Sequence, residues 1–94
     1  MNPVRKSTIA GTAKKYEFDL DVTQFLVKNL TDGDIEVRLE ETGEDVWLIP
    51  GGGWQMIPGA DNQSSHNSLY VKASETSDRG VEVEAVKYRL VRRC

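Results

Sequence analysis

The fold is decided by residues 16–22, YEFDLDV, in which every second residue is apolar and the residues between them are acidic. Successive side chains of a β-strand point to opposite faces of a sheet, so this alternation predicts a half-buried strand. The side chains expected to face the core are Tyr16, Phe18, Leu20 and Val22. The side chains expected to face solvent are Glu17, Asp19 and Asp21.

Similar short alternating stretches continue along the chain and predict further strands at 24–30, 35–41, 46–49, 54–57, 69–74 and 81–91. Asp32-Gly33 between two of these stretches predicts a tight hairpin, because glycine accepts the positive φ that such a turn requires. In the last strand the apolar residues change phase after Ala85, which predicts a β-bulge at Ala85–Val86. The residues expected inside are first Val81, Val83 and Ala85, and then Val86, Tyr88 and Leu90.

This pattern predicts an all-β protein, an antiparallel β-sandwich or small barrel of about seven strands with jelly-roll or immunoglobulin-like character. Residues 1–13 contain Pro3, Gly11 and small polar residues, which favours an extended N-terminal arm over a core element. We expect a neighbouring copy of the chain to hold this arm. Residues 14–94 then form the single β-sandwich domain.

The composition limits the classes of partner. The chain has 94 residues, a formal charge of −3 and one cysteine, Cys94, so no intrachain disulfide is available and folding in a reducing cytosol is expected. We expect a soluble, unexported chain, since no apolar stretch is long enough to span a bilayer or to serve in a signal peptide. Ten acids within residues 17–45 oppose a nucleic-acid surface, although basic residues and Tyr88 lie near the C-terminus.

We expect no catalytic residue, no metal and no cofactor. The single histidine, His66, lies in a polar loop after Asp61, and a solvated turn residue is a better interpretation than a Ser/His/Asp set. Four aspartates at strand faces and turns could offer oxygen ligands, but their spacing matches no calcium loop: Asp19, Asp21, Asp32 and Asp34. Two glycosylation sequons are interpreted as chance matches: Asn29-Leu30-Thr31 and Asn62-Gln63-Ser64.

Two tryptophans, Trp47 and Trp54, flank a glycine tract at residues 51–53, which predicts a hinge, a bulge or a site of close backbone approach. Either Trp47 and Ile49 face the core or Val46 and Leu48 do, and the alternation leaves both assignments open. Exposed indoles would suit sugar stacking, whereas Trp54 and Met56 together would suit protein contact.

The stretch FLVKNLTDGDIEV, residues 25–37, is followed by a Pro-Gly turn and by the strands LYVKA, residues 69–73, and VEV, residues 81–83. Over residues 25–86 this pattern resembles small β-sandwich proteins encoded among the structural genes of tailed bacteriophages and prophages. The resemblance implies a virion component that decorates the capsid or lies at the head-tail or tail assembly. The basic N-terminal arm is not part of the pattern, so the position on the particle is left open.

The favoured hypothesis is therefore a non-enzymatic virion structural protein, made in the host cytoplasm, whose partners are itself and other virion proteins in a homo-oligomer or capsid lattice. The alternative is a carbohydrate or cell-surface binding module that uses Trp47 and Trp54. A third hypothesis is an intracellular adaptor that adds a partner's strand to its sheet edge. The residues expected at the interface are Val4, Arg5, Ile9, Trp54 and Met56.

Overall fold

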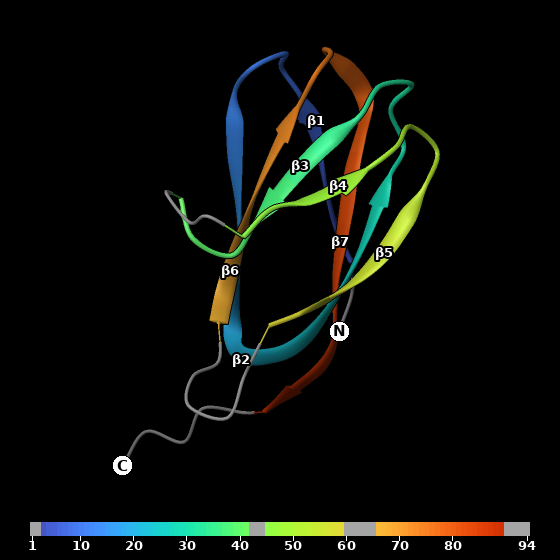
Figure 1. Cartoon of the computed structure of the whole chain (residues 1–94). Coiled ribbons are helices and arrows are strands. Elements are labelled where there is room, and N and C mark those ends of the chain that lie inside the picture. The colour runs from blue at the N-terminus through green and yellow to red at the C-terminus, as the bar shows by residue number, and fades with distance from the viewer. Residues whose placement is uncertain (1–2, 42–44, 60–65, 90–94) are drawn as a thin grey trace.

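The computed structural model describes residues 3–41, 45–59 and 66–89. All regular structure in these ranges is β-strand, so they contain no apolar helix that could cross a membrane. The strands, labelled in Figure 1, are β1 (Val4–Thr8), β2 (Ala13–Asn29), β3 (Ile35–Arg38), β4 (Trp47–Ile49), β5 (Trp54–Pro58), β6 (His66–Ala73) and β7 (Ser77–Arg89). The prediction of an all-β fold is confirmed.

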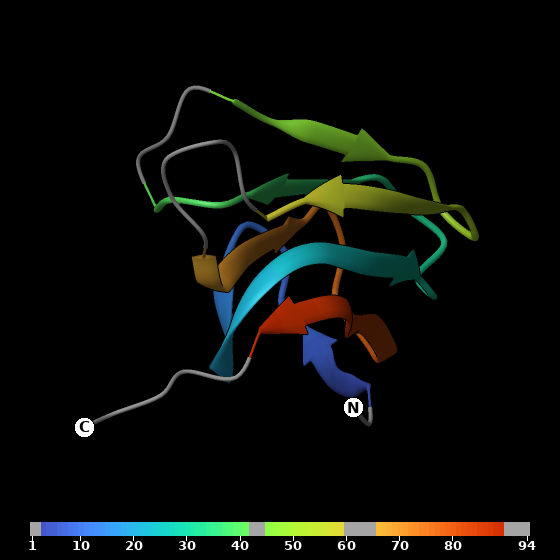
Figure 2. The ribbon, with the colours of Figure 1, turned by 90° about the horizontal axis from the view of Figure 1, so that it is seen from below.

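The strands form two antiparallel sheets that face each other as a sandwich rather than a closed barrel (Figure 2). The first sheet has the order β1-β7-β2-β5 and the second the order β2-β6-β3-β4. Strand β2 belongs to both sheets, because its first part pairs with β6 and its second part with β5 and β7. Counting β2 once in each sheet gives four strands per sheet and eight in all, rather than about seven.

Strand β2 is one continuous strand of 17 residues where the sequence predicted two, 16–22 and 24–30. Its regular ladder with β6 ends at Glu17, and its ladder with β7 begins at Asp21. In the ladder with β7, Val22 lies opposite Tyr88 and Gln24 lies opposite Lys87. Thr23 is therefore an extra residue of β2 in this ladder. An extra residue bends a strand and increases its twist, which is consistent with β2 passing from one sheet to the other here.

The hairpin predicted at Asp32-Gly33 is wrong. Strand β3 pairs with β4 and β6 but not with β2, so residues 30–34 connect two different sheets. Gly33 does not have the positive φ that the predicted turn requires. The reason is a local side chain, because the buried amide of Asn29 binds the carbonyl oxygen of Gly33 and directs the backbone away from β2.

The β-bulge predicted at Ala85–Val86 is confirmed. Phe25 lies opposite Ala85 and Gln24 opposite Lys87, so Val86 is the extra residue of β7. The prediction that Val86 and Tyr88 are inside is wrong, because both side chains are exposed. Tyr88 lies opposite the buried Val22 and so has the core-facing phase, but it is beyond the covered part of the sandwich.

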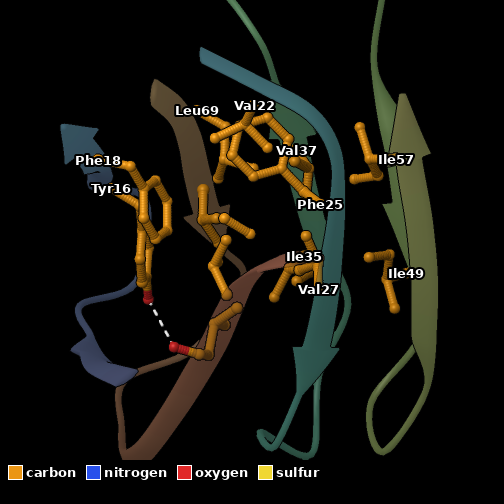
Figure 3. Close-up of a cluster of buried hydrophobic side chains, with 14 of the residues drawn as sticks. Tyr16, Phe18, Val22, Phe25, Val27, Ile35, Val37, Ile49, Ile57 and Leu69 are labelled. Atoms are coloured by element: carbon orange, nitrogen blue, oxygen red, sulfur yellow. Dashed lines mark hydrogen bonds between the residues drawn. The ribbon is translucent and has the colours of Figure 1, made fainter. Parts of the chain in front are cut away.

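The core lies between the two sheets and is built from the alternating residues that the sequence assigned to it (Figure 3). Phe18 and Phe25 of β2 pack with ring centroids 5.8 Å apart, close to the bend of that strand. Leu39 and Trp47 are partly buried against this core. The remaining buried apolar residues are Tyr16, Val22, Val27, Ile35, Val37, Ile49, Ile57, Leu69, Val71, Ala73, Val81, Val83 and Ala85.

The N-terminal segment does not extend away from the domain as an arm. Residues 4–8 form β1, which pairs antiparallel with β7 of the same chain. Val4 lies opposite Val83 and packs against the core, and Thr8 is buried. Strand β1 therefore covers an edge that would otherwise expose apolar side chains of β7.

One side of the sandwich, next to β1, is held together by Lys6 and Tyr16. The Lys6 ammonium donates to the carbonyl oxygen of Lys15 at 2.9 Å and lies 5.4 Å from the centroid of the Tyr16 ring. The Tyr16 hydroxyl donates to the carbonyl oxygen of Val81 at 2.7 Å (Figure 3, dashed line). These contacts join β1, β2 and β7 from both sheets, and we call this side the closed side.

Burial raises the pKa of Tyr16 to about 12 from an ordinary value of 10.0, because the phenolate would lose its hydration. Between these values the folded chain holds a proton that the unfolded chain has released. We therefore expect the free energy of unfolding to fall as pH rises from 10 to 12, by about 2–3 kcal/mol in total from this group. Urea unfolding across this range checks it, with Tyr16→Phe as the matched control. An equal slope in both proteins would contradict the prediction.

Candidate interface on the open side

The side of the sandwich opposite β1 is formed by β4 and β5, one edge strand from each sheet, and we call it the open side (Figure 2). Among the residues that the structure describes, β4 pairs with β3 alone and β5 with β2 alone. Each of these strands therefore presents one row of backbone N–H and C=O groups outside any sheet ladder. Unpaired strand edges are templates for pairing with another chain.

Neither edge strand of the open side has a charged residue. Both lie within residues 46–60, VWLIPGGGWQMIPGA, which have no charge in a chain that is 29% charged. Natural proteins protect free edges with lysine and other charges, and such protection is missing here. Trp54 and Leu48 are 67% and 66% exposed, the largest fractions among the exposed large apolar side chains. The combination of apolar side chains and uncharged edges favours an interface.

Asn29, the last residue of β2, holds the end of β4 in place at one end of the open side. Its buried amide nitrogen donates to the carbonyl oxygens of Gly33 at 2.8 Å and Ile49 at 3.0 Å. Its side-chain oxygen accepts from the Thr31 backbone N–H at 3.0 Å and lies 2.6 Å from the Thr31 hydroxyl. One side chain therefore joins the β2–β3 connection to the end of β4.

The glycine tract forms the turn between β4 and β5. Gly53 N–H donates to the Pro50 carbonyl at 2.9 Å, and Gly52 adopts a φ of 76°. Such a φ favours glycine at the third position of the turn. Gly51 lies so close to the backbone of Asp32 that a Cβ would meet it at 2.6 Å. The prediction of close backbone approach is therefore confirmed, and the turn sets where β5 begins.

The backbone orientation of β5 follows from two hydrogen bonds to β2. Asn29 N–H donates to Gly53 O at 2.8 Å and Gly59 N–H donates to Thr23 O at 3.0 Å. Hydrogen-bonded and non-hydrogen-bonded pairs alternate along an antiparallel ladder. Every second residue between Gly53 and Gly59 therefore turns its backbone groups away from β2, to the open side: Trp54, Met56 and Pro58.

These same residues place their side chains on the outer face of the first sheet. Trp54 lies opposite Lys28 and Met56 opposite Leu26, and none of the four is buried. The Lys28 ammonium lies 3.8 Å from a carboxylate oxygen of Glu82 on the neighbouring strand β7. The lysine charge beside Trp54 is therefore balanced within the chain, and the outer surface of β5 itself is apolar.

The five residues predicted at an interface do not gather in one place. Trp54 and Met56 lie together on β5, and Arg5 lies on the same sheet beyond β7, opposite Glu82. Val4 faces the core, while Ile9 is 52% exposed in the turn between β1 and β2. The sequence did not single out Leu48, Leu26 or Pro58 as interface residues. The absence of charge from residues 46–60 was the signal that could have found the open side.

The two orientations left open for Trp47 are now distinguished. Trp47 lies opposite the buried Val37 and packs against the core, with Ile49 buried two residues later. Val46 and Leu48 are exposed. Trp47 and Trp54 therefore do not form one exposed platform.

The other candidate sites are not assembled in the described part of the chain. Asp32 forms an ion pair with Arg79 at 3.3 Å, and no group of three or more metal-binding side chains occurs among the residues described. The Asn29 sequon has a structural use, because its amide is buried and hydrogen-bonded. Asp61, Asn62, Leu90, Cys94 and the side chains of Leu20 and His66 lie outside the described residues. Comparisons with protein-family models, with curated proteins and with solved structures found no match.

Proposed function

We propose that this chain is a non-enzymatic structural protein that works through repeated protein–protein contacts, as a component of a bacteriophage virion. In this proposal it is made in the host cytoplasm and assembles with itself and with other virion proteins, at the capsid surface or at the head-tail or tail assembly. The sandwich, jelly-roll or immunoglobulin-like in type, is the scaffold for these contacts. The virion assignment rests on the sequence resemblance in residues 25–86.

The observation that supports an assembly role is the open side. Two neighbouring edge strands without charge, with Trp54 and Leu48 exposed on them, would favour aggregation in a protein that acts alone. In an assembled particle the same edges are covered by neighbours. Each contact is small, and symmetry multiplies it into a stable assembly.

The alternative, a carbohydrate-binding module, is less well supported because it uses two exposed indoles and Trp47 faces the core. Trp54 alone is available for stacking on a sugar. Tryptophan emission that shifts or is quenched on addition of glycans would favour this alternative over assembly.

We expect the mass of the protein in solution to rise with concentration above that of one chain, because apolar edges associate. Replacing Leu48 and Trp54 together by lysine is expected to reduce this association by at least about tenfold, since charge protects an edge. Sedimentation or light scattering across a concentration series checks it, with Thr12→Lys in the exposed turn between β1 and β2 as the control. A strict monomer at every concentration would contradict the proposed function.

The virion assignment has a separate test. Genes that neighbour the gene for this chain are expected to encode capsid and tail proteins. Neighbours that encode enzymes or transporters instead would contradict it while leaving an assembly role intact.

A further inference from the structure

We infer that β5 pairs with β5 of a second copy, antiparallel about a two-fold axis at Met56, so that two first sheets join into one continuous sheet. This inference rests on the proposed assembly function and specifies the contact that carries it.

The backbone groups on the free edge of β5 are unequal. Trp54 and Met56 each offer an N–H and a C=O, whereas Pro58 offers a C=O alone. Proline is tolerated in a strand where its missing N–H would face away from the ladder, and Pro58 occupies such a position. A complementary strand can therefore donate to the Pro58 carbonyl but cannot accept from an N–H at Pro58.

A second copy of β5 donates to the Pro58 carbonyl when the two-fold axis lies at Met56. With Met56 opposite Met56 of the second copy, the two residues exchange both N–H···O=C bonds. Trp54 then lies opposite Pro58 of the second copy, and the Trp54 N–H donates to that proline carbonyl. The symmetric pair gives four hydrogen bonds, which use all four edge donors of Trp54 and Met56 in the two copies.

The side chains fit the same register. In each copy Trp54, Met56 and Pro58 point to the same outer face, beside Leu26 and Lys28 of β2. Across the seam the two Met56 side chains meet at the axis, and each indole lies over the proline ring of the other copy. Tryptophan and methionine are enriched at protein interfaces, and this pairing covers the most exposed aromatic side chain described.

The charges favour a second copy over an unrelated partner. A two-fold contact brings each residue close to its own counterpart, so charges on the edge would repel each other across the axis. Residues 46–60 have no charge, and the nearest lysine, Lys28, is paired with Glu82 in its own chain. Two copies of the β5 edge can therefore approach each other without charge repulsion.

Cysteine substitutions in a Cys94→Ser background test the register. Opposed residues at the axis have Cα atoms about 5.5 Å apart, within disulfide range. Met56→Cys is therefore expected to give a covalent dimer on mild oxidation. In Trp54→Cys the two sulfurs belong to residues about 14 Å apart, so no dimer is expected. A mixture of Trp54→Cys with Pro58→Cys is expected to cross-link, because these positions are opposed.

Met56→Pro tests the backbone pairing itself. It removes an N–H that β2 does not use, so circular dichroism and the unfolding midpoint are expected to change little, while dimerisation weakens at least about tenfold. Met56→Ala, which keeps the N–H, is expected to weaken it less. If Met56→Pro fails to fold, the cross-linking of the cysteine variants decides whether the two β5 strands pair.

The outcomes separate the two proposals. Cross-linking at Met56 and not at Trp54 supports the inferred pairing. Association that survives Met56→Pro, or cross-linking of Trp54→Cys without Met56→Cys, overturns the pairing and leaves the assembly role standing. A protein that stays monomeric at every concentration overturns both.

Discussion

Gly80→Ala is expected to destabilise the protein by about 3 kcal/mol or more and to displace β1 from β7. Gly80 is buried, has a φ of 67°, and a Cβ at this position would overlap the carbonyl oxygen of Lys6. The neighbouring atoms are backbone atoms of β1, which cannot move aside as a side chain could. The cost therefore includes the left-handed conformation, about 1–2 kcal/mol, and the lost packing of β1.

Gly11→Ala is the matched control, because Gly11 has a similar φ of 75° but no atom within 4 Å of an added Cβ. Gly11→Ala should lower the free energy of unfolding only by the cost of the left-handed backbone conformation, about 1 kcal/mol. Urea unfolding gives both costs, and hydrogen exchange at residues 4–8 reports the release of β1 directly. Equal destabilisation by the two substitutions would show that β1 does not constrain Gly80.

Asn29→Ala is expected to cost about 3–4 kcal/mol. The substitution removes the donor to Ile49 O, the acceptor of the Thr31 N–H and one of two donors to Gly33 O, which keeps the Thr31 hydroxyl, at a buried position. Each buried polar group left without a partner costs about 1–3 kcal/mol. The end of β4 and the turn before β5 lose their common support, so association through the open side should weaken as well.

The same substitution at an exposed asparagine, Asn67→Ala, is expected to change stability by no more than about 0.5 kcal/mol. Asn29→Asp adds a second control with nearly the same shape. The new carboxylate would face two carbonyl oxygens, so Asn29→Asp should be less stable than the unchanged protein at neutral pH. Its free energy of unfolding should rise again as the carboxyl is protonated in acid. Chemical unfolding at two pH values measures both effects, and a cost near that of Asn67→Ala would refute the structural role of Asn29.

The strand faces could be predicted from the sequence because alternation is a local property. Tyr16, Phe18 and Val22 are buried as their spacing requires, and the phase change at Ala85–Val86 correctly located the bulge. A bulge leaves a trace in the sequence because it reverses which residues are apolar.

Pairing between strands could not be predicted, because it depends on residues far apart in the chain. Asp32-Gly33 has the composition of a hairpin, yet the buried amide of Asn29 directs the chain to the other sheet. Nothing in residues 16–30 shows that one strand crosses between the sheets. The N-terminal segment was predicted as an arm because Pro3, Gly11 and small polar residues leave Val4 and Ile9 as its only apolar anchors, whereas its pairing with β7 is made by the backbone.

Of the candidate interface, Trp54 and Met56 could be chosen from residue type alone. The choice between the two faces for Trp47 needed the register of β4 on β3. The free edge of β5 also depends on register, since it is the alternation of hydrogen bonds to β2 that turns the backbone of Met56 outward.

Because β2 belongs to both sheets, the two sheets are expected to unfold together. A cut in the peptide chain near Thr23 would separate the half of β2 that supports β6 from the half that supports β5 and β7. The fragment before the cut would keep only β1 and the half of β2 that pairs with β6, without the strands that cover their apolar side chains. The molecule is therefore expected to melt as one cooperative unit, and the bend is the place where protease nicking or chain splitting would be least tolerated.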